Sequence, residues 1–212
     1  MPWTIFAAIS IVSMSVANLF QKIAMKEKKS DAITSALIFQ FLCVAFTGAF
    51  ALVKGFRVPA LAILFPYTLV SSLCWAFGTV CFFMAIKRIE ASEMILLTGF
   101  GAIVTIVVSS IFLQERLTPV QGIGAASILA GVSIVAFKNK FSVNQGTALA
   151  LLGTSLFGIG ITVDAFVLRS YDAISYTPIV FLVPGLLLLC FYPRKAIAAV
   201  GQLTHLFRLP LI

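Results

Sequence analysis

Long apolar runs separated by short polar segments make up most of this chain of 212 residues. Each run is long enough to cross a bilayer core of about 30 Å as a helix that rises about 1.5 Å per residue. An apolar segment at 59–65 is too short to cross and is predicted to lie at the membrane interface. The pattern predicts an all-α polytopic membrane protein with seven transmembrane helices, at residues 3–21, 32–53, 66–86, 93–113, 119–137, 146–168 and 174–192.

Composition supports this class. Hydrophobic residues make up 61% of the chain and charged residues 10%, whereas soluble domains are roughly half apolar and a quarter charged. The net charge of +8 comes from Lys and Arg in the loops, so it reports topology and gives no reason to expect a nucleic-acid partner. More of these cations lie in the loops after the first, third and fifth spans than on the other side, which predicts an outside N-terminus.

The sequence lacks the residues and motifs that most enzymes use for catalysis. Histidine occurs once, the motifs His-Glu-x-x-His and Gly-x-Ser-x-Gly do not occur, and the four cysteines lie inside apolar runs without metal-ligand spacing. We therefore expect no enzyme, metal, cofactor or disulfide. A seven-helix receptor or retinal protein is disfavoured as well, because the seventh span has no lysine for a Schiff base.

The segment at 31–42 returns in similar form at 172–183, since Asp-Ala-Ile-Thr is followed later by Asp-Ala-Ile-Ser. This similarity predicts a first five-helix repeat at 1–138 and a partial second repeat at 146–212, which consists of two helices and a tail. An odd number of spans per repeat inverts the second copy relative to the first. On this interpretation the counterparts of the third to fifth spans are missing, and the chain is expected to be truncated after its seventh span.

A combination of short motifs surrounds the fourth and fifth spans. Ala91-Ser92 opens the fourth span, Glu115-Arg-Leu-Thr118 forms a tight turn, and Gln121 and Gly131-Val132 follow in the fifth span. In these features the chain resembles EamA-type transporters of the drug/metabolite transporter superfamily. It departs from their pattern at Ala102, where a proline is usual, and in the orientation that its charges predict, since the usual N-terminus there is cytoplasmic.

The resemblance implies ten spans in two inverted repeats and secondary transport of small metabolites, amino acids or drugs by alternating access. It implies a multi-pass location in the plasma membrane, with a small-molecule solute and the lipid bilayer as partners. A homo-oligomer is one way to supply the missing helices. The alternative is a truncated, non-transporting membrane-inserted fragment or interaction protein.

Asp164 is the only acid well inside a predicted span. An intramembrane acid is costly and is by default a functional hypothesis. Asp164 therefore either contacts a substrate or proton, or has a structural role in which it pairs with Arg169 or caps nearby backbone. Gly153, Phe157 and Gly160 share its helix face, where they either line a cavity or let two helices approach closely.

Other candidates are polar or aromatic residues at helical spacing. Each has two interpretations, since such side chains either face a cavity or pack against a neighbouring helix. Small residues of the fifth span, Gly124, Ser127 and Gly131, are predicted to form a helix-packing surface. The substrate-binding candidates are Asn18, Gln21, Trp75, Thr79, Phe82, Thr98, Phe157 and Asp164.

Overall fold

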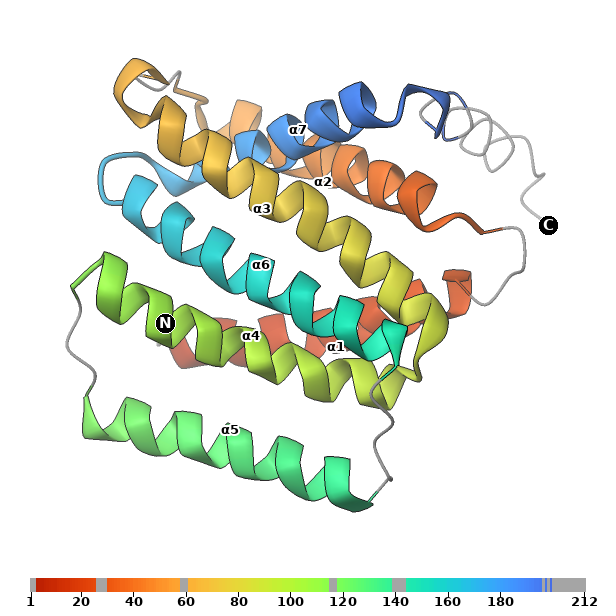
Figure 1. Ribbon diagram of the computed structural model, residues 1–212. Helices are drawn as coiled ribbons and strands as arrows, with labels where there is room; N and C mark the ends of the chain where they lie inside the picture. The colour runs from red at the N-terminus through yellow and green to blue at the C-terminus, as the bar shows by residue number, and fades with distance from the viewer. Residues whose placement is uncertain are drawn as a thin grey trace.

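The computed structural model describes residues 3–25, 30–57, 61–114, 118–138 and 144–195, with 197 and 199. These ranges form long helices and contain no strand, which confirms the prediction of an all-α protein (Figure 1). The helices are α1 (Trp3–Met25), α2 (Ala32–Lys54), α3 (Leu61–Arg88), α4 (Ala91–Phe112), α5 (Pro119–Lys138), α6 (Gln145–Val167) and α7 (Ala173–Phe191).

Six of these helices are long and apolar enough to cross a membrane, namely α1, α2, α3, α4, α6 and α7. The chain is therefore a multi-pass membrane protein by length and composition. The remaining expected span coincides with α5, a helix of 20 residues, and its crossing stays a prediction. Residues 61–65 are not separate from the third span, because α3 already begins at Leu61 and includes Pro66. Their location at the membrane interface stays a prediction. Neighbouring helices and local adjustments let a membrane helix accommodate such a proline.

The contacts of α6 and α7 organise the described part of the bundle (Figure 1). Helix α6 lies between α3 and α4, and α7 packs along α2 and against α3. Helix α5 lies at the edge of the bundle and packs on α4. Segments that are far apart in sequence therefore form the main interfaces, namely α3 with α6, α4 with α6 and α2 with α7.

Glycine allows the backbones around α6 to touch. A Cβ atom on Gly153 would lie 3.1 Å from the carbonyl oxygen of Gly78 in α3, and one on Gly158 would lie 2.7 Å from the carbonyl oxygen of Gly101 in α4. Because lipid is as apolar as the side chains, membrane helices associate largely through such close packing of small residues. The stripe that includes Gly153 thus brings helices together, as one of the two interpretations predicts.

The predicted packing surface of α5 is wrong for the described residues. Gly124, Ser127 and Gly131 are exposed, and a Cβ atom on either glycine would meet nothing within 4 Å. Small residues at helical spacing permit a close contact but do not specify a partner helix. In this structure the close contacts use the glycines of α3, α4 and α6 instead.

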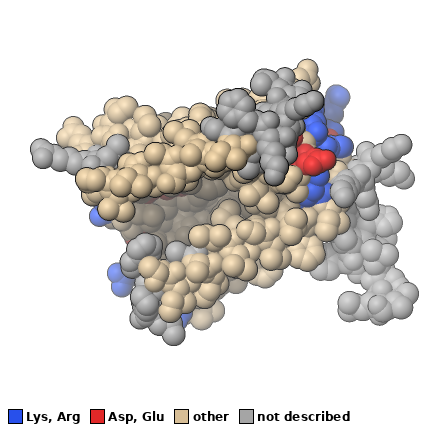
Figure 2. Space-filling view, turned by 90° about the horizontal axis from the view of Figure 1, so that it is seen from below, with Lys and Arg blue, Asp and Glu red and all other residues tan. Residues whose placement is uncertain are grey.

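In one view of the surface, acidic side chains and a group of Lys and Arg side chains lie at one end, further Lys and Arg side chains lie at the opposite end, and the middle is hollowed and uncharged (Figure 2). Near the C-terminal ends of α1 and α3, the Nζ atom of Lys22 donates hydrogen bonds to the carbonyl oxygens of Ile86, at 2.6 Å, and Ile89. A cation is favourable there, because the last carbonyls of a helix carry partial negative charge. Lys22 thus fixes the C-terminal end of α1 to the C-terminal end of α3.

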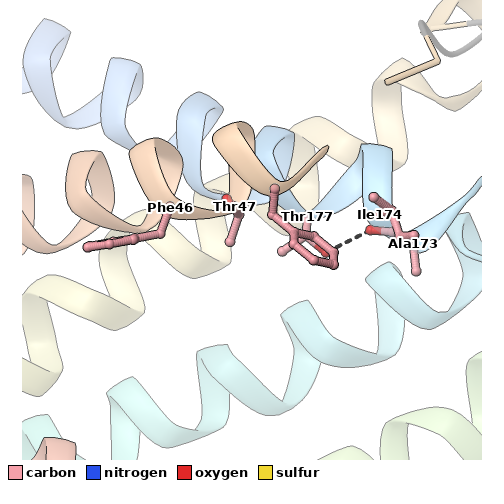
Figure 3. A pocket seen from close by; sticks show the side chains of 6 residues that line it. Phe46, Thr47, Ala173, Ile174 and Thr177 are labelled. Carbon is pink, nitrogen blue, oxygen red and sulfur yellow. Dashed lines mark hydrogen bonds between the residues drawn. The ribbon is translucent and has the colours of Figure 1, made fainter. Parts of the chain in front are cut away.

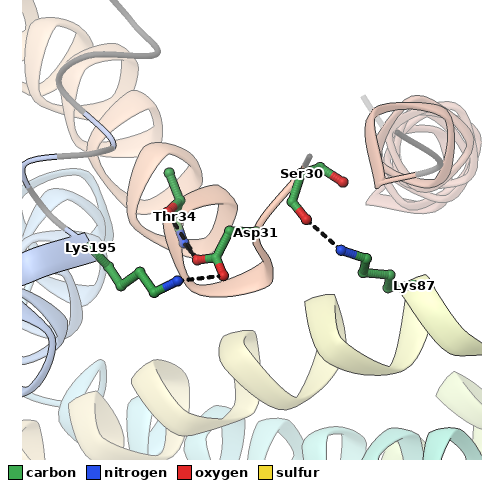
Figure 4. A network of polar contacts seen from close by, with 5 residues as sticks. All are labelled: Ser30, Asp31, Thr34, Lys87 and Lys195. Atoms are coloured by element: carbon green, nitrogen blue, oxygen red, sulfur yellow. Dashed lines mark hydrogen bonds and ion pairs between the residues drawn. The ribbon is translucent and has the colours of Figure 1, made fainter. Parts of the chain in front are cut away.

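The repeated segments begin their helices in the same way. Asp31 precedes α2 and accepts from the backbone N–H of Thr34 at 3.0 Å, while Asp172 precedes α7 and accepts from that of Ser175 at 3.0 Å. Both are N-caps, which satisfy otherwise unpaired N–H groups. The Nζ atom of Lys195, which follows α7, lies 2.8 Å from Asp31 (Figure 4).

Asp172 has a related environment at the start of α7. The backbone N–H of Arg57, which follows α2, donates to the Ser175 hydroxyl at 3.0 Å. Hydrogen bonds from Ser175 and the nearby charge of Arg57 hold the pKa of Asp172 below its usual value. Each helix of the α2–α7 pair therefore starts with an aspartate N-cap near the end of the other helix, and Asp31 forms an ion pair there with Lys195.

The ion pair between Asp31 and Lys195 predicts a small loss of stability in acid. Partial burial opposes the charge of Asp31, but hydrogen bonds from Lys195 and Thr34 leave its pKa below the ordinary value. A lowered folded-state pKa gives stability that is present above the unfolded-state pKa of about 3.9 and is lost as the pH falls through the folded-state value. Because both side chains are partly exposed, we expect only about 0.2–1 kcal/mol.

Thermal unfolding in detergent between pH 6 and pH 3 measures this contribution. Over this range the melting temperature of the wild type should fall by up to about 4 °C more than that of a Lys195→Gln variant. Equal losses in the two proteins would show that the ion pair does not contribute.

Candidate functional site

Three hydrogen bonds hold the carboxylate of Asp164 inside the bundle. Trp75 Nε1 donates to Oδ2 at 2.7 Å, and the hydroxyl of Tyr176 donates to Oδ1 at 2.8 Å. Ser71 Oγ donates to Oδ1 as well. Asp164 is 9% exposed, and Ser71 and Tyr176 are almost fully buried. Asp164 of α6 therefore joins α3 and α7 in one polar cluster.

Helical spacing explains how these groups meet. Ser71 and Trp75 are four residues apart and share a face of α3, while Gly160 lies one turn before Asp164 on α6. A Cβ atom on Gly160 would lie 3.3 Å from Trp75 Nε1. The glycine therefore leaves room for the indole, whose N–H reaches the carboxylate.

In the described part of the chain, the side-chain hydrogen bonds to Asp164 come from no cation. Its three donors are the neutral groups of Ser71, Trp75 and Tyr176, and the structural pairing with Arg169 stays a prediction. Burial of a carboxylate is costly unless it is paired or neutralised. The site is thus suited to take up a positive charge, either a proton or a cationic group of a ligand.

Aromatic rings extend the site along α3 and α6. The ring centroids of Trp75 and Phe157 are 5.1 Å apart, those of Phe82 and Phe157 are 6.1 Å apart, and those of Trp75 and Phe181 are 6.3 Å apart. Such separations are typical of interacting aromatic pairs. The structure thus brings Trp75, Phe82 and Phe157 together, with Phe181 of α7 as a further member, and Trp75 connects this group to Asp164.

A second polar contact lies next to this aromatic group. Gln40 Nε2 of α2 donates to the hydroxyl of Thr79 at 3.1 Å, and this hydroxyl donates to the carbonyl oxygen of Trp75 at 2.7 Å. Gln40 and Thr79 are buried. Thr79 was predicted from its position on the Trp75 face of α3, whereas Gln40 was not, although a glutamine inside an apolar span is a usable signal.

The other sequence candidates lie outside this cluster. Asn18 and Gln21 are partly buried residues of α1, and Thr98 is a partly buried residue of α4. The hydroxyl of Thr98 donates to the carbonyl oxygen of Ile95 in its own helix. Among the described residues, only members of α3, α6 and α7 bond to the Asp164 carboxylate, and these three residues are not among them.

A groove of about 320 Å³ lies between α2 and α7 (Figure 3). Its threonine hydroxyls already donate to their own helices, Thr47 to Cys43 and Thr177 to Ala173. Phe46 and Phe50 are exposed, so the groove offers an apolar, outward-facing surface. It lacks the polar groups that a site for a polar solute requires.

Comparison with known proteins adds two observations. Residues 1–137 match the EamA-like transporter family. A protein of Methanocaldococcus jannaschii called "Uncharacterized protein MJ1333.1" is 29% identical over 73 residues, which are 34% of this chain and 53% of that protein. The chain thus spans about half the length of this curated relative.

Proposed function

Since the chain belongs to the EamA-like transporter family, we propose that it is a secondary transporter that moves a small solute across the cell membrane by alternating access. Small metabolites, amino acids and drugs are the solute classes that its resemblance to EamA-type transporters implies. The solute reaches a site inside the helix bundle, and a gradient drives its movement.

The Asp164 cluster is the observation that carries this proposal. A buried carboxylate held by neutral donors, Ser71, Trp75 and Tyr176, is costly for stability and has no charge partner in its own cluster. Such a group inside a membrane-spanning helix is typical of ion, proton or substrate sites. Asp164 therefore binds the cationic part of the solute, or the proton that is exchanged for it.

An inverted repeat supports the alternating-access mechanism. Helices α2 and α7 have the same aspartate N-cap, at Asp31 and Asp172, and each helix starts near the end of the other. We assign residues 1–138 to the first repeat and 146–212 to part of the second. Rocking of one repeat against the other then exposes Asp164 to each side in turn.

Solute flux into proteoliposomes tests the proposal. The purified full chain is reconstituted, a pH gradient or membrane potential is imposed, and the uptake of a panel of radiolabelled amines, amino acids and metabolites is measured. We expect saturable uptake of at least one solute that stops when an ionophore collapses the gradient. Absence of gradient-dependent flux for the whole panel, with either sign of gradient, would contradict the proposal.

A further inference from the structure

Gln40 has a buried acceptor without a partner. Its side chain is 0% exposed, and its Oε1 atom has no hydrogen-bond partner among the described residues. Buried polar atoms are nearly always paired, and an unpaired one calls for an explanation such as a water, an ion or a ligand. This atom therefore points to a group that binds at Gln40.

The orientation of the Gln40 amide follows from its neighbour. The hydroxyl of Thr79 has one proton, which it donates to the carbonyl oxygen of Trp75. Thr79 can then only accept from Gln40, so the amide must present its NH₂ group to Thr79, at 3.1 Å. The atom that remains unpaired is thus the carbonyl oxygen, which accepts hydrogen bonds and does not donate them.

Gln40 and Asp164 lie at the two ends of one strip along α3. Ser71, Trp75 and Thr79 follow each other at intervals of four residues on the same face, so the strip is about 12 Å long. Ser71 and Trp75 donate to Asp164 at one end, and Thr79 accepts from Gln40 at the other. The carboxylate of Asp164 lacks a cationic partner among these contacts, and the amide oxygen of Gln40 lacks a hydrogen-bond donor.

Helix α7 packs against this strip and has weakened backbone hydrogen bonding. Pro178 and Pro184 lie inside α7, and a proline cannot donate the usual bond to the residue four positions earlier. Phe181 lies between them in sequence, and its ring centroid is 6.3 Å from that of Trp75 and 6.4 Å from that of Phe39. Movement of this segment of α7 would expose the strip, and it would break fewer backbone hydrogen bonds than the same movement of a helix without proline.

We propose that Gln40 is a second polar contact of the solute site, and that the solute is a small aromatic or other amphipathic amine with a further N–H or O–H donor. The proposal rests on Asp164 as the solute site of the proposed function. The ammonium group neutralises Asp164, the second donor binds Gln40 Oε1, and the apolar middle of the solute contacts Trp75 and Phe181.

The same chemistry predicts which solutes are excluded. Both ends of the strip accept hydrogen bonds, and the described contacts of Asp164 and Gln40 include no cation for a carboxylate. A zwitterionic amino acid would place its carboxylate close to Asp164, which is unfavourable. Tyramine, phenethylamine and tyrosine are therefore informative probes, because they differ only by one hydroxyl or one carboxylate.

Equilibrium binding of these probes to the purified full chain tests the contact. We expect the wild type to bind tyramine about tenfold more tightly than phenethylamine, as one hydrogen bond to a buried acceptor predicts, and to bind tyrosine more weakly than both. The Gln40→Leu variant should bind tyramine about tenfold more weakly and phenethylamine unchanged. Gln21→Leu is the matched control, because Gln21 Oε1 is also buried without a partner but belongs to α1.

Thermal unfolding separates a ligand contact from a structural role. Leucine has a similar volume, and it removes both the unpaired buried acceptor and the hydrogen bond to Thr79, whose hydroxyl still donates to Trp75. These two effects oppose each other, so the melting temperature of Gln40→Leu should change little. Equal weakening of both amines in this variant, or no preference for tyramine in the wild type, would overturn the Gln40 contact while Asp164-dependent flux stands. Failure of the proposed function itself would instead appear as a lack of any gradient-dependent flux.

Discussion

Asparagine in place of Asp164 is expected to lower solute flux about 30-fold or more in a protein that still folds. The amide keeps an oxygen acceptor for Ser71, Trp75 or Tyr176 but loses the negative charge that a proton or ammonium group neutralises. Removal of one member of a buried charge pair costs about 2 kcal/mol or more, which corresponds to this loss of binding. Initial rates of uptake into proteoliposomes measure it.

Asp172→Asn is the matched control for this substitution. Asp172 also accepts hydrogen bonds through its carboxylate, from the N–H and the hydroxyl of Ser175, but it is an exposed cap at the start of α7. Asparagine is an equally good N-cap, so flux should stay close to that of the wild type. Similar flux in Asp164→Asn and the wild type would rule out a role for the Asp164 charge.

Alanine in place of Gly158 is expected to lower the free energy of unfolding by about 1–3 kcal/mol, as overpacking of a tight interface typically does. The added Cβ atom would lie 2.7 Å from the carbonyl oxygen of Gly101 and 3.0 Å from the side chain of Val104. The first of these is a backbone atom, so a rotamer change cannot relieve the clash and α4 must move away from α6. Denaturant unfolding of the purified protein in detergent measures the loss.

Gly48→Ala provides the control within another membrane helix. A Cβ atom on Gly48 would meet nothing within 4 Å, and alanine in a helix interior is favoured over glycine by about 0.5–1 kcal/mol. This variant should be as stable as the wild type or more stable. If both alanine variants had the same stability, the close contact of α4 with α6 would not be important for the fold.

Hydropathy predicted the helices well but not their arrangement. The expected spans coincide with α1 to α7 to within a few residues, except that α3 begins at Leu61, before Pro66. The long apolar runs determine these boundaries directly. A helix that is apolar on all faces does not reveal which face is buried, so the position of α6 between α3 and α4 could not be read from the sequence.

The prediction of the site was incomplete for the same reason, because the sequence does not show which helix faces meet. Asp164 and the Trp75 face of α3 were found, because an acid in a span is rare and because residues four apart share a face. Ser71 and Tyr176 were missed, since their importance arises only when α3 and α7 meet α6. Pairing between helices has no local signature in the chain.

The hydrogen bonds of Lys22 attach the C-terminal end of α1 to α3, so that α1 could tilt about this point. Lys22 bonds the end of α3 through Ile86 and Ile89, whereas most described side chains along α1 are exposed. From Lys22 to Trp3 the helix is about 29 Å long. A tilt of about 10° around this pivot would therefore move the far end by about 5 Å, about the distance of one helical turn. A small change in the tilt of α1 at Lys22 would thus cause a larger displacement of its N-terminal end, at the opposite membrane surface.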